Sequence, residues 1–174
     1  MSLTAAATRE IVFDVEGYAT TKRMAAGGRR YFQSDKFAVG GYEWAIRYCP
    51  DRGGVYVSVT LVLLSELIKD GDDAGQEVGV RFACALQDRH GELSSESWRS
   101  ESYVFSVCGQ ERGFWKYATL DVLEDPDFIV GDCFTLACTV SVLRKPILRA
   151  CTTKKTQAKN SDQKYQLFFQ PMLM

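Results

Sequence analysis

Residues 40–51 read GGYEWAIRYCPD, and their alternation is the clearest structural signal in the chain. One side of an extended backbone would carry large apolar groups, namely Tyr42, Trp44, Ile46 and Tyr48. Because such side chains suit a pleated, half-buried surface, the stretch predicts a strand with a buried aromatic face. The Pro50-Asp51 pair, followed by two glycines at 53 and 54, then predicts a reversal of the chain.

Comparable runs recur along the sequence, with turn residues between them: 11–15, 42–49, 55–64, 78–88, 102–107 and 133–143. Most alternate between an apolar and a wetter face, as strands do when two antiparallel sheets pack together. The segment DRHG at 88–91 predicts a hairpin turn. We therefore expect an all-β antiparallel sandwich, with at most a short helical turn near 65–69 or 120–124.

The length, net charge and apolar content of the chain limit the classes of protein to which it can belong. A chain of 174 residues with a formal net charge of -1 fits one domain and has no overall field that would attract nucleic acid or an anionic membrane. No apolar run reaches the roughly 18 residues of a membrane span, and the start lacks the pattern of a secretory signal. We expect a protein of the cytoplasm or nucleus with no membrane partner.

The last 31 residues differ from the rest. The segment 144–174 is rich in Lys and Arg, and its centre, 152–164, is poor in hydrophobic residues. Such a segment cannot repay the entropy of ordering itself. We expect a domain over 9–143 followed by a basic, disordered tail, whose apolar end at 167–174 is the one part able to dock back as a strand.

Nothing in the sequence predicts an enzyme, and we expect no cofactor. The single histidine, His90, lies in a polar turn, and no glycine pair has the Lys-Ser/Thr that a phosphate loop needs. The six cysteines lack zinc-site and disulfide spacings and fit reduced core residues.

Nucleic-acid binding is favoured by one basic patch, formed by Lys22, Arg23, Arg29 and Arg30. The overall charge balance and the lack of a stacking platform argue against it.

Several segments together resemble the MATH domain: GYATTK (17–22), YFQSDKFAVGGYEWAIRYCPD (31–51), VYVSVTLVLL (55–64), VRFACALQDRHG (80–91), GFWKY (113–117) and DCFTLACTVSV (132–142). The likeness covers 9–143 and is strongest to plant proteins that join a MATH domain to a BTB/POZ domain. It implies an eight-stranded antiparallel sandwich, with the double glycine and the aromatic strand as core features. Nothing after Leu143 resembles a BTB domain.

The resemblance also implies a function. MATH domains bind short extended segments of other proteins, and members with a BTB domain present such substrates to cullin-type ubiquitin ligases, so ligase components are indirect partners. The alternative is a scaffold or decoy outside any ligase. Carried over by motif, the peptide groove comprises Thr60, Phe82, Tyr103, Gln110, Glu111, Arg112, Gly113 and Phe114.

The sequence departs from the family at two of these positions. Arg112 stands where the pattern has Trp, and Thr60 stands where Tyr is common. An arginine contributes to peptide binding by pairing with an acid or by stacking flat, rather than as an apolar anchor. With Trp115 nearby, Arg112 favours a ligand that carries an acidic or phosphorylated residue.

Overall fold

The computed structural model describes residues 5–26, 31–69 and 76–143. Its elements, in chain order, are β1 (Ala5–Glu16), α1 (Tyr18–Ala25), β2 (Phe32–Gln33), β3 (Phe37–Val39), β4 (Tyr42–Arg52), β5 (Tyr56–Leu63), β6 (Val78–Gln87), β7 (Arg99–Phe105), β8 (Glu111–Thr119), α2 (Leu120–Leu123) and β9 (Cys133–Leu143). The predicted tail at 144–174 lies outside the described residues.

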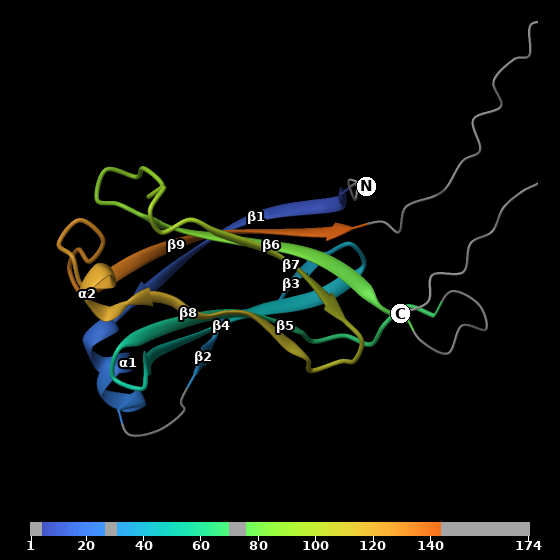
Figure 1. Cartoon of the computed structure of the whole chain (residues 1–174), viewed down its shortest axis with the longest axis horizontal. Helices are drawn as coiled ribbons and strands as arrows, with labels where there is room; N and C mark the ends of the chain where they lie inside the picture. The colour runs from blue at the N-terminus through green and yellow to red at the C-terminus, as the bar shows by residue number, and fades with distance from the viewer. Residues whose placement is uncertain (1–4, 27–30, 70–75, 144–174) are drawn as a thin grey trace, which may run out of the picture.

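Two antiparallel sheets pack face to face (Figure 1), which confirms the predicted sandwich. One sheet has the order β1-β9-β6-β7, and the other has the order β2-β4-β5-β8, with β3 also paired to β4. The described residues give nine strands rather than eight, because the segment before the double glycine pairs with β4 in two short pieces. Between them the Ser34 hydroxyl accepts the Ile46 N–H at 3.0 Å and interrupts the ladder.

The double glycine forms a hairpin turn. Val39 of β3 lies opposite Tyr42 of β4, and the two residues between them, Gly40 and Gly41, have φ angles of 64° and 84°. A two-residue hairpin of this twist needs a positive φ at both central positions. The glycines therefore join two strands, of which the sequence predicted only the second.

The predicted reversal lies slightly further along the chain. β4 continues through Pro50 to Arg52, with an irregular register after Cys49. Gly53 and Gly54, with φ angles of 70° and 77°, make the turn into β5. The prediction that Pro50 belongs to the turn was thus wrong, since a strand tolerates proline where the ladder is already broken.

The core lies between the sheets and holds the predicted aromatic face. Trp44, Ile46 and Tyr48 are buried, and Trp44 is fully enclosed. The Trp44 indole N–H donates to the Val39 carbonyl at 3.1 Å, and its ring meets Phe105 of the other sheet edge-on, with centroids 5.1 Å apart. The Trp44 side chain thus links the β3–β4 hairpin of one sheet to β7 of the other sheet.

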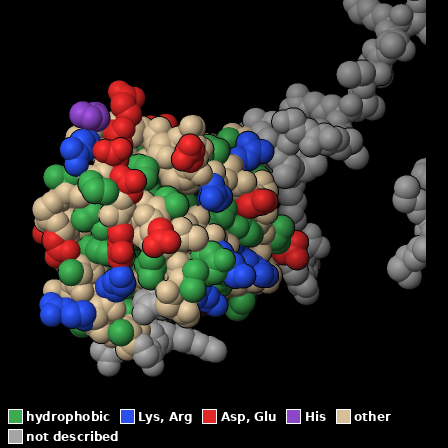
Figure 2. Space-filling model, turned by 60° about the vertical axis from the view of Figure 1, so that its left-hand side comes forward, with side chains coloured by type: hydrophobic (Ala, Val, Ile, Leu, Met, Phe, Trp, Pro, Cys, Tyr) green, Lys and Arg blue, Asp and Glu red, His purple; other side chains and the backbone are tan. Residues whose placement is uncertain are grey.

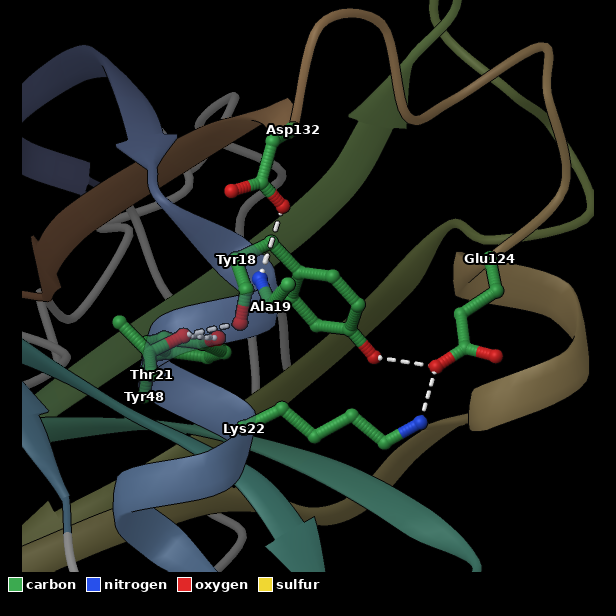
Figure 3. Close-up of polar contacts among 7 residues, drawn as sticks. All are labelled: Tyr18, Ala19, Thr21, Lys22, Tyr48, Glu124 and Asp132. Atoms are coloured by element: carbon green, nitrogen blue, oxygen red, sulfur yellow. Dashed lines mark hydrogen bonds and ion pairs between the residues drawn. The ribbon is translucent and has the colours of Figure 1, made fainter.

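Helix α1 is an element that the sequence did not predict. Its eight residues begin after Gly17, and the structure gives it no side-chain N-cap, so the usual sequence signals are missing. Tertiary contacts hold it instead (Figure 3). The Tyr18 hydroxyl donates to Glu124 at 2.9 Å, Lys22 forms an ion pair with the same carboxylate, and the Ala19 N–H donates to Asp132 at 2.8 Å.

A short helical turn was expected near 65–69 or near 120–124, and the structure has it at the second of these places. The turn predicted near 120–124 is α2, capped by the Thr119 hydroxyl, which accepts the Val122 N–H at 3.4 Å. No helix forms over 65–69. The DRHG turn is present, with the Gly91 N–H donating to the Asp88 carbonyl at 3.0 Å.

Strand β8 is a further element that the sequence did not predict. The sequence predicts no strand between 107 and 133, yet β8 begins at Glu111 and pairs with β5, where Thr60 lies opposite Gly113. Its sequence, ERGFWKYAT, places a glycine and three charges within nine residues, which conceals the alternation of a strand.

Two further observations concern helices that could span a membrane and the state of the cysteines. No helix in the described ranges is both long and apolar enough to span a membrane. Among the same residues, Cys84 and Cys138 are buried, Cys49, Cys108 and Cys133 are partly buried, and all five are free thiols.

The hairpin geometry makes a stability prediction. A Cβ at Gly40 would lie 2.6 Å from Cγ2 of Val142, whereas a Cβ at Gly109, also at positive φ, meets nothing within 4 Å. We expect Gly109→Ala to lower the free energy of unfolding by about 1 kcal/mol and Gly40→Ala by about 2–4 kcal/mol. Urea unfolding of both variants measures the difference, and equal losses would show that the Val142 contact is unimportant.

The α1 contacts make a pH prediction. Hydrogen bonding from Lys22, and to a smaller extent from Tyr18, lowers the pKa of Glu124. A lowered pKa stabilises the fold above the unfolded pKa, and this stabilisation is lost as the pH falls. The side chain is 38% exposed, so we expect Glu124→Gln to cost only about 0.5–1 kcal/mol at pH 7 and nothing below about pH 4.

Denaturant unfolding across this pH range tests the pH prediction. Glu66→Gln is the matched control, because Glu66 forms no ion pair among the described residues. A cost for Glu124→Gln that is independent of pH would mean that the carboxylate charge does not stabilise α1.

Candidate functional site

The predicted site residues lie along one side of the sandwich. β7 ends the four-stranded sheet and β8 ends the other, and a ring contact between Tyr103 of β7 and Phe114 of β8 places these two terminal strands on the same side. β8 pairs with β5 on one flank, and its other row of backbone N–H and C=O groups has no strand partner among the described residues. Tyr103 comes from β7, while Thr60 and Phe82 lie one strand further in. We call this side of the molecule the β8 edge.

The structure brings three of the predicted aromatic residues together. Phe82 and Phe114 stack with ring centroids 5.4 Å apart, and Tyr103 meets Phe114 edge-on at 6.4 Å. Phe82 is fully buried and Phe114 is 9% exposed, so both rings fill the space between the sheets. Tyr103 is half-buried and reaches the surface; partial burial, and the nearby Glu101, raise the pKa of its hydroxyl.

A polar group occupies the outer face of the same strands. The Thr60 hydroxyl donates to Glu111, and Nη1 of Arg47 donates to Oε2 of Glu111 at 3.1 Å. The Arg47 guanidinium also donates to Gln33 at 2.9 Å and covers the Tyr31 ring at 4.3 Å. Thr60 is only 1% exposed, so a ligand could not contact it directly. Its role is to hold the Glu111 carboxylate in place through the hydrogen bond from its hydroxyl.

Gly113 is where β8 approaches β5 most closely. Its φ is 152°, and a Cβ there would lie 2.7 Å from the Thr60 Cα and 2.8 Å from the Val59 carbonyl oxygen. Only glycine fits this position without moving a strand. The backbone of β8 is consequently bare at the centre of the edge.

Two larger side chains extend from β8 into solvent. Arg112 is exposed, and it forms no ion pair with a described residue. Trp115 is 41% exposed, with the Arg52 guanidinium 4.5 Å from its ring. It lies at a register shift opposite Ser58, and such bulges re-aim side chains at the rims of sheets.

Gln110 has a structural contact, because its side-chain oxygen accepts the Ser106 N–H at 2.7 Å in the turn before β8.

Sequence reasoning missed Arg47 and the cation–π pair of Arg52 with Trp115. Arg47 is on the polar side of the alternating stretch, but only the register of β4 on β5 places it opposite Thr60. That register joins distant segments and leaves no local signal. Arg52 lies between the residues predicted to form a reversal, and it is the last residue of β4.

Charge and metal-binding groups add little to this site. On the face drawn in Figure 2, acidic and basic side chains both occur and neither sign covers the surface alone. Within the described ranges, no three His, Cys, Asp or Glu side chains gather where they could hold a metal ion.

The fold and this edge define the molecule as a two-sheet antiparallel β-sandwich in which the terminal strand β8 has no strand partner on one flank among the described residues and carries exposed aromatic and basic groups. Residues 10–140 match the model of the MATH domain. The chain therefore belongs to the MATH domain family, a protein-interaction fold that is not a known enzyme family.

Curated relatives agree with this assignment. The chain is 33% identical over 148 residues to BTB/POZ and MATH domain-containing protein 5 of Arabidopsis thaliana, covering 78% of this chain and 34% of the relative. It is 30% identical over 143 residues to protein 4 of the same series and organism, covering 75% and 29%. The chain thus spans about a third of the length of these relatives.

A solved structure shares the fold at low sequence identity. TRAF5 of Notothenia coriiceps superposes with a TM-score of 0.51 at 16% identity, covering 82% of this chain and 76% of that structure. This likeness concerns the arrangement of strands alone.

The half-buried polar group makes a prediction about stability. Arg47 and Glu111 are 19% and 24% exposed, whereas the Lys36–Glu43 pair is 66% and 47% exposed. A glutamine at 111 cannot accept from both Thr60 and Arg47 without turning its own donor toward one of them. We expect Glu111→Gln to cost about 1–2 kcal/mol and the control Glu43→Gln less than about 0.5 kcal/mol in urea unfolding. Equal costs would contradict a structural role for the Glu111 contacts.

Proposed function

We propose that this chain binds extended segments of partner proteins, laid as an added strand along the β8 edge. The observation that carries the proposal is the free backbone row of β8, flanked by the exposed Arg112 and Trp115 and by the half-buried Tyr103. A guest strand gains main-chain hydrogen bonds from such an edge, and the flanking side chains select its sequence. Binding is assigned to the region 9–143, in the cytoplasm or nucleus.

The two sides of β8 differ, and this difference supports sequence selection. Tyr103 and Phe114 lie on the side that faces the other sheet, while the Thr60–Glu111 contact lies on the outer side. Alternate residues of a guest strand would meet an aromatic side and a polar side in turn. Phe82 and Thr60 contribute by fixing the positions of Phe114 and Glu111.

The ligand that suits this edge carries an acidic or phosphorylated residue. Arg112 has no carboxylate partner among the described residues, and a guanidinium binds carboxylate and phosphate groups through paired hydrogen bonds. Lys116 of β8 and Arg52 at the end of β4 are further cations near this edge, each placed over an aromatic ring.

The proposed role of this binding is substrate recognition for cullin-type ubiquitin ligases. It follows from the resemblance to plant proteins whose names combine MATH and BTB/POZ domains. The alternative is a scaffold or decoy that binds the same segments without delivering them. Affinity purification from native extract separates the two: stoichiometric cullin components support an adaptor, and their absence beside other captured proteins supports a decoy.

The choice of ligand is tested with peptide pools that pair each phosphorylated or acidic sequence with its neutral counterpart. We expect the full chain to bind the anionic peptides at micromolar concentration, and Arg112→Trp to shift the preference to apolar sequences. Arg81→Trp on β6 is the control, because Arg81 is exposed and alternates with the buried Val80 and Phe82, which places it on the outer face of its sheet rather than between the sheets. Unchanged preferences in Arg112→Trp would remove the anionic ligand from the proposal.

The added strand is tested separately on a peptide selected in this way. Methylation of its backbone nitrogens, one at a time, should abolish binding at alternate positions, because every second N–H of a guest strand would face β8. Tyr103→Ala should weaken binding, and Val104→Ala, on the opposite face of β7, should not. Loss of binding without alternation would contradict strand addition.

A further inference from the structure

A cavity of about 260 Å³ opens between the sheets on the side opposite to the β8 edge. Its walls come from the second half of β1, from β2 with the following Ser34, and from the first residues of β9. Thr21 of α1 also lines it. No residue predicted for the peptide groove is among its lining residues.

The cavity exists because the two sheets close unevenly along this side. Where β1 faces β3, the rings of Phe13 and Phe37 lie 6.2 Å apart, and Arg9 donates to the Ala38 carbonyl at 3.4 Å. Further along β1 the facing strand is β2, which has only two residues. The sheets are therefore joined at one end of this side and open at the other.

The inner wall of the cavity is aromatic. The Tyr48 ring lies 5.9 Å from Phe32 and 5.5 Å from Phe134, and the Tyr48 hydroxyl shares a 2.7 Å hydrogen bond with Thr21. With that hydroxyl occupied, the ring offers its apolar surface. The volume lies below the roughly 300–1,000 Å³ of sites that enclose a small molecule, so it suits a single large side chain.

The mouth of the cavity runs along a free strand edge. β1 ends its sheet, and Phe13 and Val15 on its half-buried side alternate with Asp14 and Glu16 on its exposed side. Neither carboxylate forms an ion pair with a described residue, and Asp14 accepts one hydrogen bond, from Thr135 at 2.7 Å. An added strand would send alternate side chains into the cavity and their neighbours beside these carboxylates.

The geometry points to a second peptide site at β1. It takes an extended segment of another protein in which a large apolar residue stands between two basic residues. The apolar side chain enters the cavity, the backbone pairs with β1, and the Lys or Arg neighbours lie opposite Asp14 and Glu16. The site goes beyond the proposed function, since it uses a different edge, a different sheet and the opposite ligand charge.

Three synthetic peptides test this inference on the full chain. They are acetyl-Thr-Lys-Phe-Lys-Thr-amide, the charge-reversed acetyl-Thr-Glu-Phe-Glu-Thr-amide, and acetyl-Thr-Lys-Ala-Lys-Thr-amide, which lacks the large apolar group. We expect only the first to produce saturable changes in the amide NMR signals of β1, β2 and the start of β9. Equal responses to the first and second peptides would overturn the charge assignment, and equal responses to the first and third would overturn the use of the cavity.

Protein variants locate the site independently. The double substitution Asp14→Asn with Glu16→Gln should weaken binding of the first peptide about five-fold. Glu10→Gln is the matched control, because Glu10 is exposed on the same strand but does not line the cavity. Arg112→Trp should leave this binding unchanged, so failure here and failure at the β8 edge are distinguishable.

Other occupants of the β1 site would give different results, and each would overturn the proposal. Carbodiimide cross-links between Glu16 and lysines of 144–174, with signals that no peptide shifts, would assign the cavity to the chain's own tail. Self-association that the double variant abolishes would assign it to a second copy. Absence of any response to the first peptide would show that the cavity binds no such segment.

Discussion

The fold depends on the enclosure of one indole. Trp44 is the largest fully buried side chain, and its N–H is satisfied by the carbonyl of Val39, on the strand that precedes the double glycine. Its ring packs against Phe105 at the end of β7. A buried indole needs both an apolar enclosure and a hydrogen-bond acceptor. Meeting both needs at once fixes the β3–β4 hairpin, the pairing of β4 with its neighbours and the approach of the second sheet.

Because the centre of the sandwich is filled by buried side chains, the unpaired strand edges and the remaining space lie at its margins. Each sheet ends in two terminal strands, and on each side of the molecule the two terminal strands meet differently. Along β8, Phe82 and Phe114 fill the space between the sheets. The groups accessible there are the backbone of β8 and the exposed side chains of Arg112 and Trp115. Along β1 the filling is incomplete, and what is offered is a cavity. The two sides therefore present distinct chemistry within one fold.

The sequence predicted those features that depend on neighbours in the chain. The burial of Trp44, Ile46 and Tyr48 follows from local alternation, and α2 follows from local turn signals. Helix α1 escaped prediction because its partners, Glu124 and Asp132, lie more than a hundred residues away. The site was predicted as a set of residues by resemblance. The division of that set into buried supports and exposed groups required the register that places Thr60 opposite Gly113.

The two buried cysteines have a consequence for handling the protein. Cys84 and Cys138 face each other across β6 and β9 with Sγ atoms 3.0 Å apart, and burial raises the pKa of the Cys84 thiol. Oxidation and alkylation both proceed through the thiolate, which this dry interior suppresses. Because both thiols are buried, we expect them to resist thiol reagents while the sandwich is intact and to react when the sheet opens. Alkylation of this pair by a thiol reagent would therefore report opening of the sheet.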